Sequence, residues 1–111
     1  MVGAAVVTFE DRGIRLLRAL ASVYDITLRL AEECVPTAWM DVRVALCPTP
    51  TSPARLAAGL HEFGHVVLGP DELAAWRWAM LRMEEFCDAE CVARAKKVRD
   101  ESLAVYGLAA A

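Results

Sequence analysis

The segment His61-Glu62-Phe63-Gly64-His65 has residue types and a spacing that could do chemistry. In a helix, two histidines four residues apart project from one face, one turn from each other. Both imidazoles can then reach one zinc ion, at about 2.0–2.1 Å each. Glu62 is rotated by about 100° around the helix axis, so it can act on a metal-bound water as general base. The segment predicts a zinc site with His61 and His65 as ligands and Glu62 as the catalytic residue.

A catalytic zinc ion needs a third protein ligand, and both histidines of the chain already lie in this segment. The candidates are carboxylates further along the chain. Glu84 and Glu85 lie about 20 Å along a helix that starts near Pro70, at about 1.5 Å per residue. A first-turn residue of that helix instead folds back beside the last turn of the histidine helix. We therefore predict Glu72 as the third ligand. Asp71, simpler as a helix cap, stays an alternative, as do the two later glutamates.

The N-terminal half of the chain predicts one helix and two strands. Thr8 is a helix-capping residue before apolar residues that recur with helical spacing up to Tyr24. Alternating residues over 26–30 predict a strand, although a continuing helix also fits the pattern. Residues 40–46 alternate most clearly and predict a second strand. The side chains of this strand expected to pack on the helices are Val42, Val44 and Leu46.

The C-terminal half predicts helices. Ser52 followed by Pro53 marks the start of the histidine helix, which should end near Gly69-Pro70. The following segment lacks glycine and proline up to Tyr106. A single helix of that length is unusual in a small domain, so we expect a break near Cys87-Asp88. The sequence thus predicts an α+β fold in one domain of residues 1–111.

The helix after the histidine segment begins with Glu72-Leu73-Ala74-Ala75-Trp76-Arg77-Trp78-Ala79. With this helix, residues 52–79 resemble the active-site region of the ImmA/IrrE-type metallopeptidases of phages, mobile elements and bacterial stress regulation. That family follows an H-E-x-x-H helix with E-x-x-A-N-x-F-A, matched here at Glu72, Ala75 and Ala79, with Trp78 in the aromatic place. This chain has Trp76 at the position of the family's Asn, and its link between the two helices is shorter than in the family.

The resemblance implies a minimal zincin-like domain with an N-terminal helix, a small β-hairpin or sheet, the HExxH helix, a glutamate helix and a C-terminal helix. It implies His61, His65 and Glu72 as Zn²⁺ ligands and Glu62 as catalytic base. It also implies a protein or peptide as the substrate, which could be a regulator.

Composition bears on the partners and the compartment. The net charge of −3 gives no basic field for direct nucleic-acid binding or for an anionic membrane. Residues 1–7 are apolar but short and lack a basic lead-in, so we expect neither a signal peptide nor a transmembrane segment. The four cysteines form no dense framework, and we expect reduced thiols, Cys87 and Cys91 included. Cytoplasmic localisation follows.

These patterns predict a zinc-dependent hydrolase, a small metallopeptidase. The alternative is a zincin-derived interaction or regulatory protein of phage or mobile-element type, in which the metal is structural or lost. Metal analysis of the purified protein and the activity of a Glu62→Gln variant separate the two.

Overall fold

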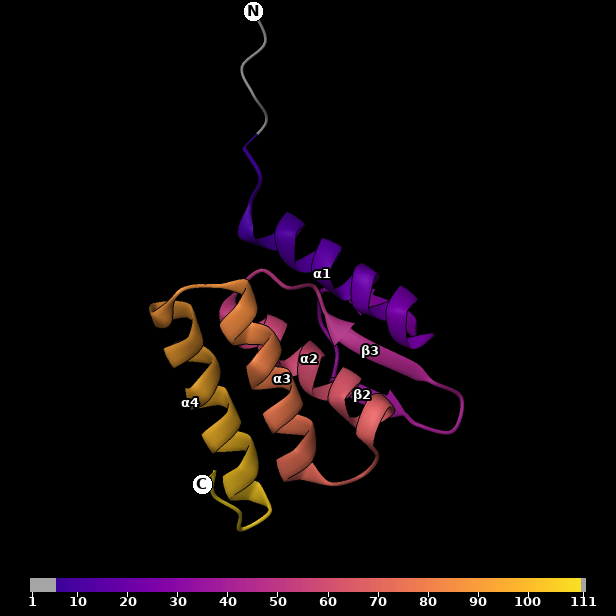
Figure 1. The fold of residues 1–111 in the computed structure, drawn as a ribbon, viewed down its shortest axis with the longest axis vertical. Helices are drawn as coiled ribbons and strands as arrows, with labels where there is room; N and C mark the ends of the chain where they lie inside the picture. Colours follow the sequence, from indigo (N-terminus) through magenta and orange to yellow (C-terminus); the bar gives the residue numbers. More distant parts are fainter. Residues whose placement is uncertain (1–5, 111) are drawn as a thin grey trace, which may run out of the picture.

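The computed structural model describes residues 6–110. Over these residues the chain forms four helices and a three-stranded mixed sheet (Figure 1), so the predicted α+β class is confirmed. In chain order the elements are α1 (Phe9–Tyr24), β1 (Thr27–Ala31), β2 (Thr37–Trp39), β3 (Val44–Pro48), α2 (Pro53–Leu68), α3 (Glu72–Phe86) and α4 (Ala89–Val105).

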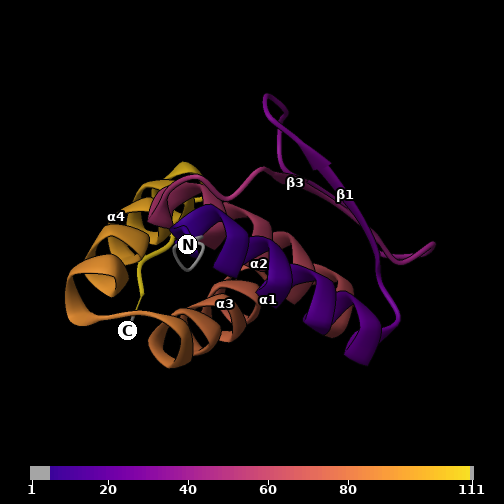
Figure 2. The same cartoon turned by 90° about the horizontal axis from the view of Figure 1, so that it is seen from above.

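The sheet has the strand order β1–β3–β2, with β1 parallel and β2 antiparallel to β3. A turn at residues 40–43 closes the β2–β3 hairpin. Viewed from above, the helices lie on one side of the sheet (Figure 2). In the strand order of the described residues, β2 is an edge strand, and it contacts α2.

The ambiguous segment after α1 is a strand. Thr8 caps α1 as predicted, and the helix ends at Tyr24, after which Asp25 takes a left-handed conformation with φ 54°. The Arg43 side chain donates hydrogen bonds to the carbonyl oxygens of Tyr24 and Asp25, which fixes this end of α1 against the hairpin turn. β1 then begins at Thr27. The strand predicted over 26–30 is confirmed with a shift of one residue, and the alternative of a continuing helix is wrong.

The strand predicted over 40–46 begins later and turns its other face to the helices. It is β3, in which Ala45 and Cys47 are fully buried. Because alternate residues of a strand face opposite sides, their neighbours lie on the outer face. The small Ala45 and Cys47 side chains let the sheet approach α2. The residues predicted to pack on the helices lie instead in the exposed turn or on that half-buried outer face: Val42, Val44 and Leu46.

α2 is the central helix and contacts the sheet and the other three helices. Leu56, Leu60 and Phe63 on this helix are fully buried.

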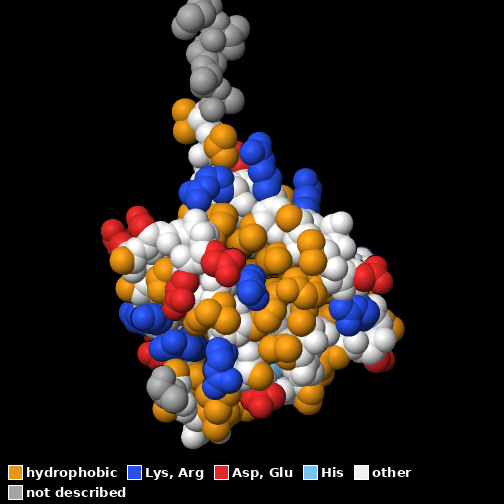
Figure 3. Space-filling view, in the orientation of Figure 1, with side chains coloured by type: hydrophobic (Ala, Val, Ile, Leu, Met, Phe, Trp, Pro, Cys, Tyr) orange, Lys and Arg blue, Asp and Glu red, His pale blue; other side chains and the backbone are white. Residues whose placement is uncertain are grey.

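The break between α3 and α4 falls at Cys87-Asp88, as predicted. On the face seen in Figure 3, hydrophobic side chains are interspersed with charged ones, and Lys and Arg side chains gather at the end where α1 begins.

Cys87 and Cys91 form a disulfide across the turn between α3 and α4. The expectation of reduced thiols is wrong for this pair. The helix break at Asp88 turns the two side chains toward each other, with their Cα atoms 5.9 Å apart, a usual separation for a disulfide. Cys34 and Cys47 are free.

The helices of residues 6–110 include none that is long and apolar enough to cross a membrane. The apolar segment over residues 1–7, expected to be neither a signal peptide nor a transmembrane segment, lies mostly outside the described residues.

Candidate metal centre

The start of α2 determines where its histidines point. The Ser52 hydroxyl oxygen accepts a hydrogen bond from the backbone N–H of Arg55 at 3.3 Å, and Pro53 occupies the first helical position. This start puts His61 and His65 in the third and fourth turns of the helix. Their ring centroids lie 4.6 Å apart. Both imidazoles therefore project from one face of α2, as predicted.

Gly64 lets α3 approach that face closely. A Cβ atom at this position would lie 2.6 Å from the carbonyl oxygen of Ala75 and 3.0 Å from its Cα atom. These are backbone atoms, which cannot turn aside as a flexible side chain can. A glycine at this point of α2 therefore brings the two helices together, although glycine costs roughly 1 kcal/mol of helix stability relative to alanine.

The turn between α2 and α3 is short. The backbone N–H of Gly69 donates to the carbonyl oxygen of His65 at 2.8 Å and closes the end of α2. Asp71 then caps α3, because its Oδ1 accepts a hydrogen bond from the backbone N–H of Ala74 at 3.1 Å. As a result the first turn of α3, which carries Glu72, lies beside the last turns of α2.

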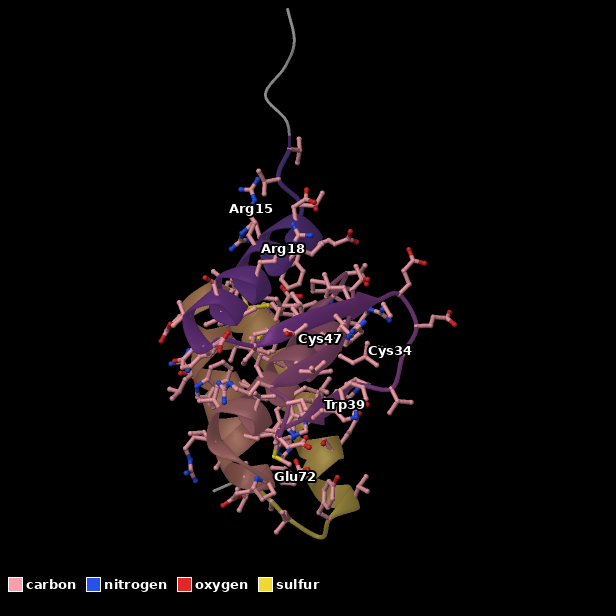
Figure 4. The ribbon with its side chains drawn as sticks, turned by 90° about the vertical axis from the view of Figure 1, so that its right-hand side faces the viewer. Arg15, Arg18, Cys34, Trp39, Cys47 and Glu72 are labelled. Atoms are coloured by element: carbon pink, nitrogen blue, oxygen red, sulfur yellow. A yellow bond between two sulfur atoms is a disulfide. The ribbon has the colours of Figure 1, made fainter. Side chains whose placement is uncertain are left out.

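Glu72 lies between the two imidazoles. Its Oε2 atom is 2.7 Å from Nε2 of His61 and 3.0 Å from Nε2 of His65. One ligand atom from each of the three residues lies within 4.8 Å of the others, and this is the metal-capable group found among the described residues. We call it the His–His–Glu cluster. In Figure 4, Glu72 lies toward the end of the molecule away from Arg15 and Arg18 of α1.

A backbone carbonyl orients His65. Its Nδ1 atom lies 2.9 Å from the carbonyl oxygen of Gly69, which can only accept, so Nδ1 carries the proton. In the neutral ring, Nε2 then turns its lone pair toward the Glu72 carboxylate at 3.0 Å. Two electron-rich atoms at this distance need a cation between them, either a proton or a metal ion. Histidines that bind metals commonly donate their other N–H to a carbonyl in this way.

The protonation states of the cluster suit a metal ion. Burial lowers the pKa of His61, although the hydrogen bond to Glu72 opposes the change. Desolvation raises the pKa of Glu72. The hydrogen bond and charge of His61, together with His65, lower this pKa by more, so it ends below its ordinary value. At neutral pH His61 is therefore a neutral imidazole and Glu72 an ionised carboxylate, the forms that bind metals.

The distances in the cluster fit a metal ion with a small adjustment. Ligand atoms placed tetrahedrally around a zinc ion lie about 3.3 Å apart. The two nitrogen–oxygen distances of 2.7 and 3.0 Å are those of direct hydrogen bonds. The Glu72 side chain is 16% exposed and so has room to move the short distance required. Two imidazole nitrogens and one carboxylate oxygen form a donor set typical of catalytic zinc sites.

Glu62 is buried beside the cluster and has a free oxygen. The residue is 7% exposed, and its Oε2 atom has no hydrogen-bond partner among the described residues. Burial raises the pKa of Glu62 to about 7, an effect that the charge of His65 opposes and that of Glu72 reinforces. A carboxyl group that titrates near neutral pH can both accept and donate a proton, as general acid–base chemistry requires.

A groove of about 320 Å³ opens over these side chains. Glu62, His65 and Glu72 line one side of it. The other lining residues come from the turn after α2 and from the segment around the edge strand β2: Pro36, Thr37, Ala38, Met40 and Pro70. Trp39 of β2 and Glu72 lie toward the same end of the molecule (Figure 4). The groove therefore runs between an edge of the sheet and the cluster.

The other acids considered for the third ligand lie apart from the imidazoles. Asp71 is exposed and caps α3. Glu84 and Glu85 are exposed near the far end of that helix, where Glu85 lies 3.9 Å from Arg82. The carboxylate beside both imidazoles is thus that of Glu72.

Two features of the site were not predicted from the sequence. One is the Gly69 carbonyl that holds His65. The second is the indole of Trp76, which stacks on His61 with centroids 4.4 Å apart and an angle of 9° between the planes. Trp76 follows Glu72 by four residues, and that spacing could have shown that both face the histidines. The charge of Glu72 also raises the pKa of Tyr106, which follows α4.

Comparisons of the chain with protein-family models, with curated proteins and with solved structures find no match. The resemblance to the ImmA/IrrE-type metallopeptidases thus stays a prediction from residues 52–79. The functional argument depends on the geometry of the His–His–Glu cluster and of Glu62.

Proposed function

We propose that this protein is a zinc-dependent hydrolase that cleaves peptide bonds, built as a minimal zincin-like domain. The observation that carries the proposal is the convergence of Nε2 of His61 and Nε2 of His65 on one Glu72 carboxylate oxygen, at 2.7 and 3.0 Å, while Nδ1 of His65 is held by a carbonyl. A divalent cation resolves this contact and completes a set of two histidines and one glutamate. Catalytic zinc sites use such a set and keep a fourth position open for water or substrate.

Glu62 is the proposed general base. Zinc in such a donor set supplies Lewis acidity and makes water a nucleophile near neutral pH. The free Oε2 atom of Glu62 accepts the proton of the attacking water and delivers it to the leaving amine. The burial that raises the pKa of Glu62 to about 7 brings it into the range in which both transfers are possible.

A peptide is the proposed substrate because an edge strand borders the groove. β2 pairs with β3 along one side, so its other edge can bind an extended chain by strand addition. A peptide bound there passes over Glu62 and the cluster. The apolar lining residues Pro36, Ala38 and Met40 favour uncharged side chains next to the scissile bond.

The test uses the full chain loaded with zinc and a mixed-sequence peptide library read by mass spectrometry. We expect Glu62→Gln to keep one zinc ion per chain and to lower kcat/KM by about 10²–10⁴-fold, the usual contribution of a general base. The control, Glu85→Gln, changes an acid of α3 whose side chain is 72% exposed and should leave both unchanged.

Hydrolysis by Glu62→Gln at the parent rate, or a parent chain that binds no zinc, contradicts the proposal. A parent chain that binds zinc but cleaves no peptide in the library points to the interaction protein instead.

A further inference from the structure

The two histidines of the cluster are held in different ways. Nδ1 of His65 donates to the Gly69 carbonyl at 2.9 Å. Nδ1 of His61 lies 3.7 Å from Oε1 of Glu62, beyond hydrogen-bond distance, and makes no hydrogen bond to another described residue. A metal-binding histidine normally needs such a contact to fix the direction of its ring. On its Nδ1 side, His61 therefore lacks the carbonyl or carboxylate that would fix its ring, and another contact must do so.

The indole of Trp76 covers one face of that ring. The two planes are nearly parallel, at 9°, with their centroids 4.4 Å apart. The ring of His65 lies on His61 edge to face, at 67° and 4.6 Å. Rotation of the His61 imidazole about its Cβ–Cγ bond would drive it into one neighbour or the other. The stack therefore keeps Nε2 directed at Glu72.

Trp76 is itself fixed from α4. The residue is 2% exposed, and its Nε1–H donates to the hydroxyl oxygen of Ser102 at 3.2 Å. A buried indole N–H needs such a partner, and the bond selects one orientation of the ring. The contacts run from Ser102 through Trp76 to His61. α4, which gives no ligand to the cluster, is in this way connected to it.

We propose that Trp76 and Ser102 are positioning residues for the metal centre, which set the ring plane of His61 in place of a carbonyl or carboxylate hydrogen-bonded to its Nδ1 atom. The proposal rests on the proposed zinc site. Metal binding makes the imidazole more positive, and the electron-rich face of an indole attracts positive charge. The stack therefore favours the metal-bound form of His61 over the free form.

Zinc affinity of the metal-free full chain, measured by competition with a chromophoric chelator, tests the proposal. Trp76→Leu removes the stack and should weaken zinc binding by about 10–100-fold, the usual effect of losing an outer contact to a ligand. Trp76→Phe keeps an aromatic ring and should recover most of that loss. The control is Trp78→Phe, a buried tryptophan of the same helix that contacts Tyr24 and Arg82, and it should bind like the parent.

Ser102→Ala keeps the proposal testable if Trp76→Leu does not fold. Loss of the hydroxyl should weaken zinc binding a few-fold. Since Ser102 acts through the indole N–H, the same change in the Trp76→Phe background should have no further effect. Thermal unfolding of each metal-free variant shows whether stability has changed, and a merely structural role would alter the unfolding temperature without altering the zinc affinity of the folded chain.

Proton NMR gives a readout without metal, because the chain has only two histidines. The indole ring current should shift the His61 ring protons upfield in the parent, and Trp76→Leu should abolish that shift. If the parent binds zinc and Ser102→Ala and the Trp76 variants bind it as tightly, the positioning role is overturned and the zinc site stands. If the parent binds no zinc, both proposals fall.

Discussion

The turns that precede α3 and α4 are built alike and lead to different outcomes. Asp71 and Asp88 each cap the helix that follows, and each helix carries a glutamate in its first turn. Glu72 in α3 lies between two imidazoles. Glu90 in α4 is exposed, with its Oε1 atom 3.1 Å from Arg94 of the same helix. The local pattern is shared, so the role of each glutamate depends on the helix that it faces.

The preceding helix accounts for the difference. α2 presents two histidines on one face and, between them, the glycine that lets α3 come close. The last turn of α3 carries instead the exposed Glu84 and Glu85, and the turn after this helix is closed by the disulfide. A first-turn glutamate, favoured anyway by the helix dipole, is available for a second role where a neighbouring helix places imidazole nitrogens beside it.

The largest effect should come from removing the carboxylate in each turn. Structural zinc sites bind with about 10–16 kcal/mol from four ligands, or about 2.5–4 kcal/mol for each ligand. Loss of one ligand in Glu72→Gln should therefore weaken zinc binding about 1,000-fold, roughly 4 kcal/mol. Glu90→Gln removes an exposed acid and should leave zinc affinity unchanged. Isothermal titration of the metal-free variants measures both. Equal affinities of the two variants would show that the turns are equivalent and that Glu72 is no ligand.

Gly64→Ala should break the approach of α3 to α2. The new Cβ would lie 2.6 Å from the carbonyl oxygen of Ala75, so the two helices must move apart. We expect the free energy of unfolding to fall by about 3 kcal/mol and zinc binding to weaken. The control is Gly59→Ala in the same helix, where the new Cβ meets the Cys47 side chain at 3.1 Å, away from α3. Urea unfolding and zinc titration compare them. Gly64→Ala that binds zinc like the parent would contradict the close-approach argument.

Glu62→Gln extends the comparison to a buried acid whose Oε2 atom has no hydrogen-bond partner among the described residues. In the folded metal-free chain the pKa of Glu62 is raised from 4.5 to about 7, chiefly by burial, so its proton binds more tightly when folded than when unfolded. The stability from this group is present below pH 4.5 and is lost as the pH rises to about 7. The variant should therefore exceed the parent by roughly 2–3 kcal/mol near pH 8 and by little near pH 4.

Urea unfolding in the presence of a chelator, at both pH values, measures this difference. Glu85→Gln serves as the matched exposed acid and should show no such pH dependence. A Glu62→Gln variant that gains no stability at the higher pH would show that Glu62 is not desolvated.

The smallest effect should come from the turn before α4. Replacing both Cys87 and Cys91 by serine opens a short loop, whose closure contributes roughly 1–2 kcal/mol in the chain-entropy account. The unfolding temperature should fall by a few degrees. Zinc affinity should stay within about twofold of the parent, because this turn lies at the other end of α3 from Glu72. A large loss of zinc binding would show that the two turns are not independent.

The starts of the helices could be predicted from local signals in the sequence. Thr8, Ser52 and Asp71 accept hydrogen bonds from backbone N–H groups close in the chain, so their role needs no tertiary information. Glu72 could be predicted as the residue near the histidines because it lies in the first turn of its helix, whereas Glu84 lies several turns further along. The face of β3 that packs on the helices could not be predicted, because alternating residues define two faces of a strand and only tertiary packing decides which one is buried.

Contacts between distant elements were the least predictable part of the site. The stack of Trp76 on His61 and its hydrogen bond to Ser102 join three helices, and a buried tryptophan has many other possible neighbours. The disulfide of Cys87 with Cys91 depends on the helix break between them, because a continuous helix would have kept both side chains parallel on its surface.

X-ray absorption at the zinc edge on the metal-loaded full chain tests the central claim most directly. The His–His–Glu cluster predicts nitrogen and oxygen scatterers alone at about 2.0–2.2 Å, with the outer-shell signal of two imidazoles. In Glu72→Gln the spectrum should change in the first shell while both imidazoles remain. Sulfur scattering at about 2.3 Å, or a first shell with fewer than two imidazoles, would contradict the claim that this cluster is the metal centre.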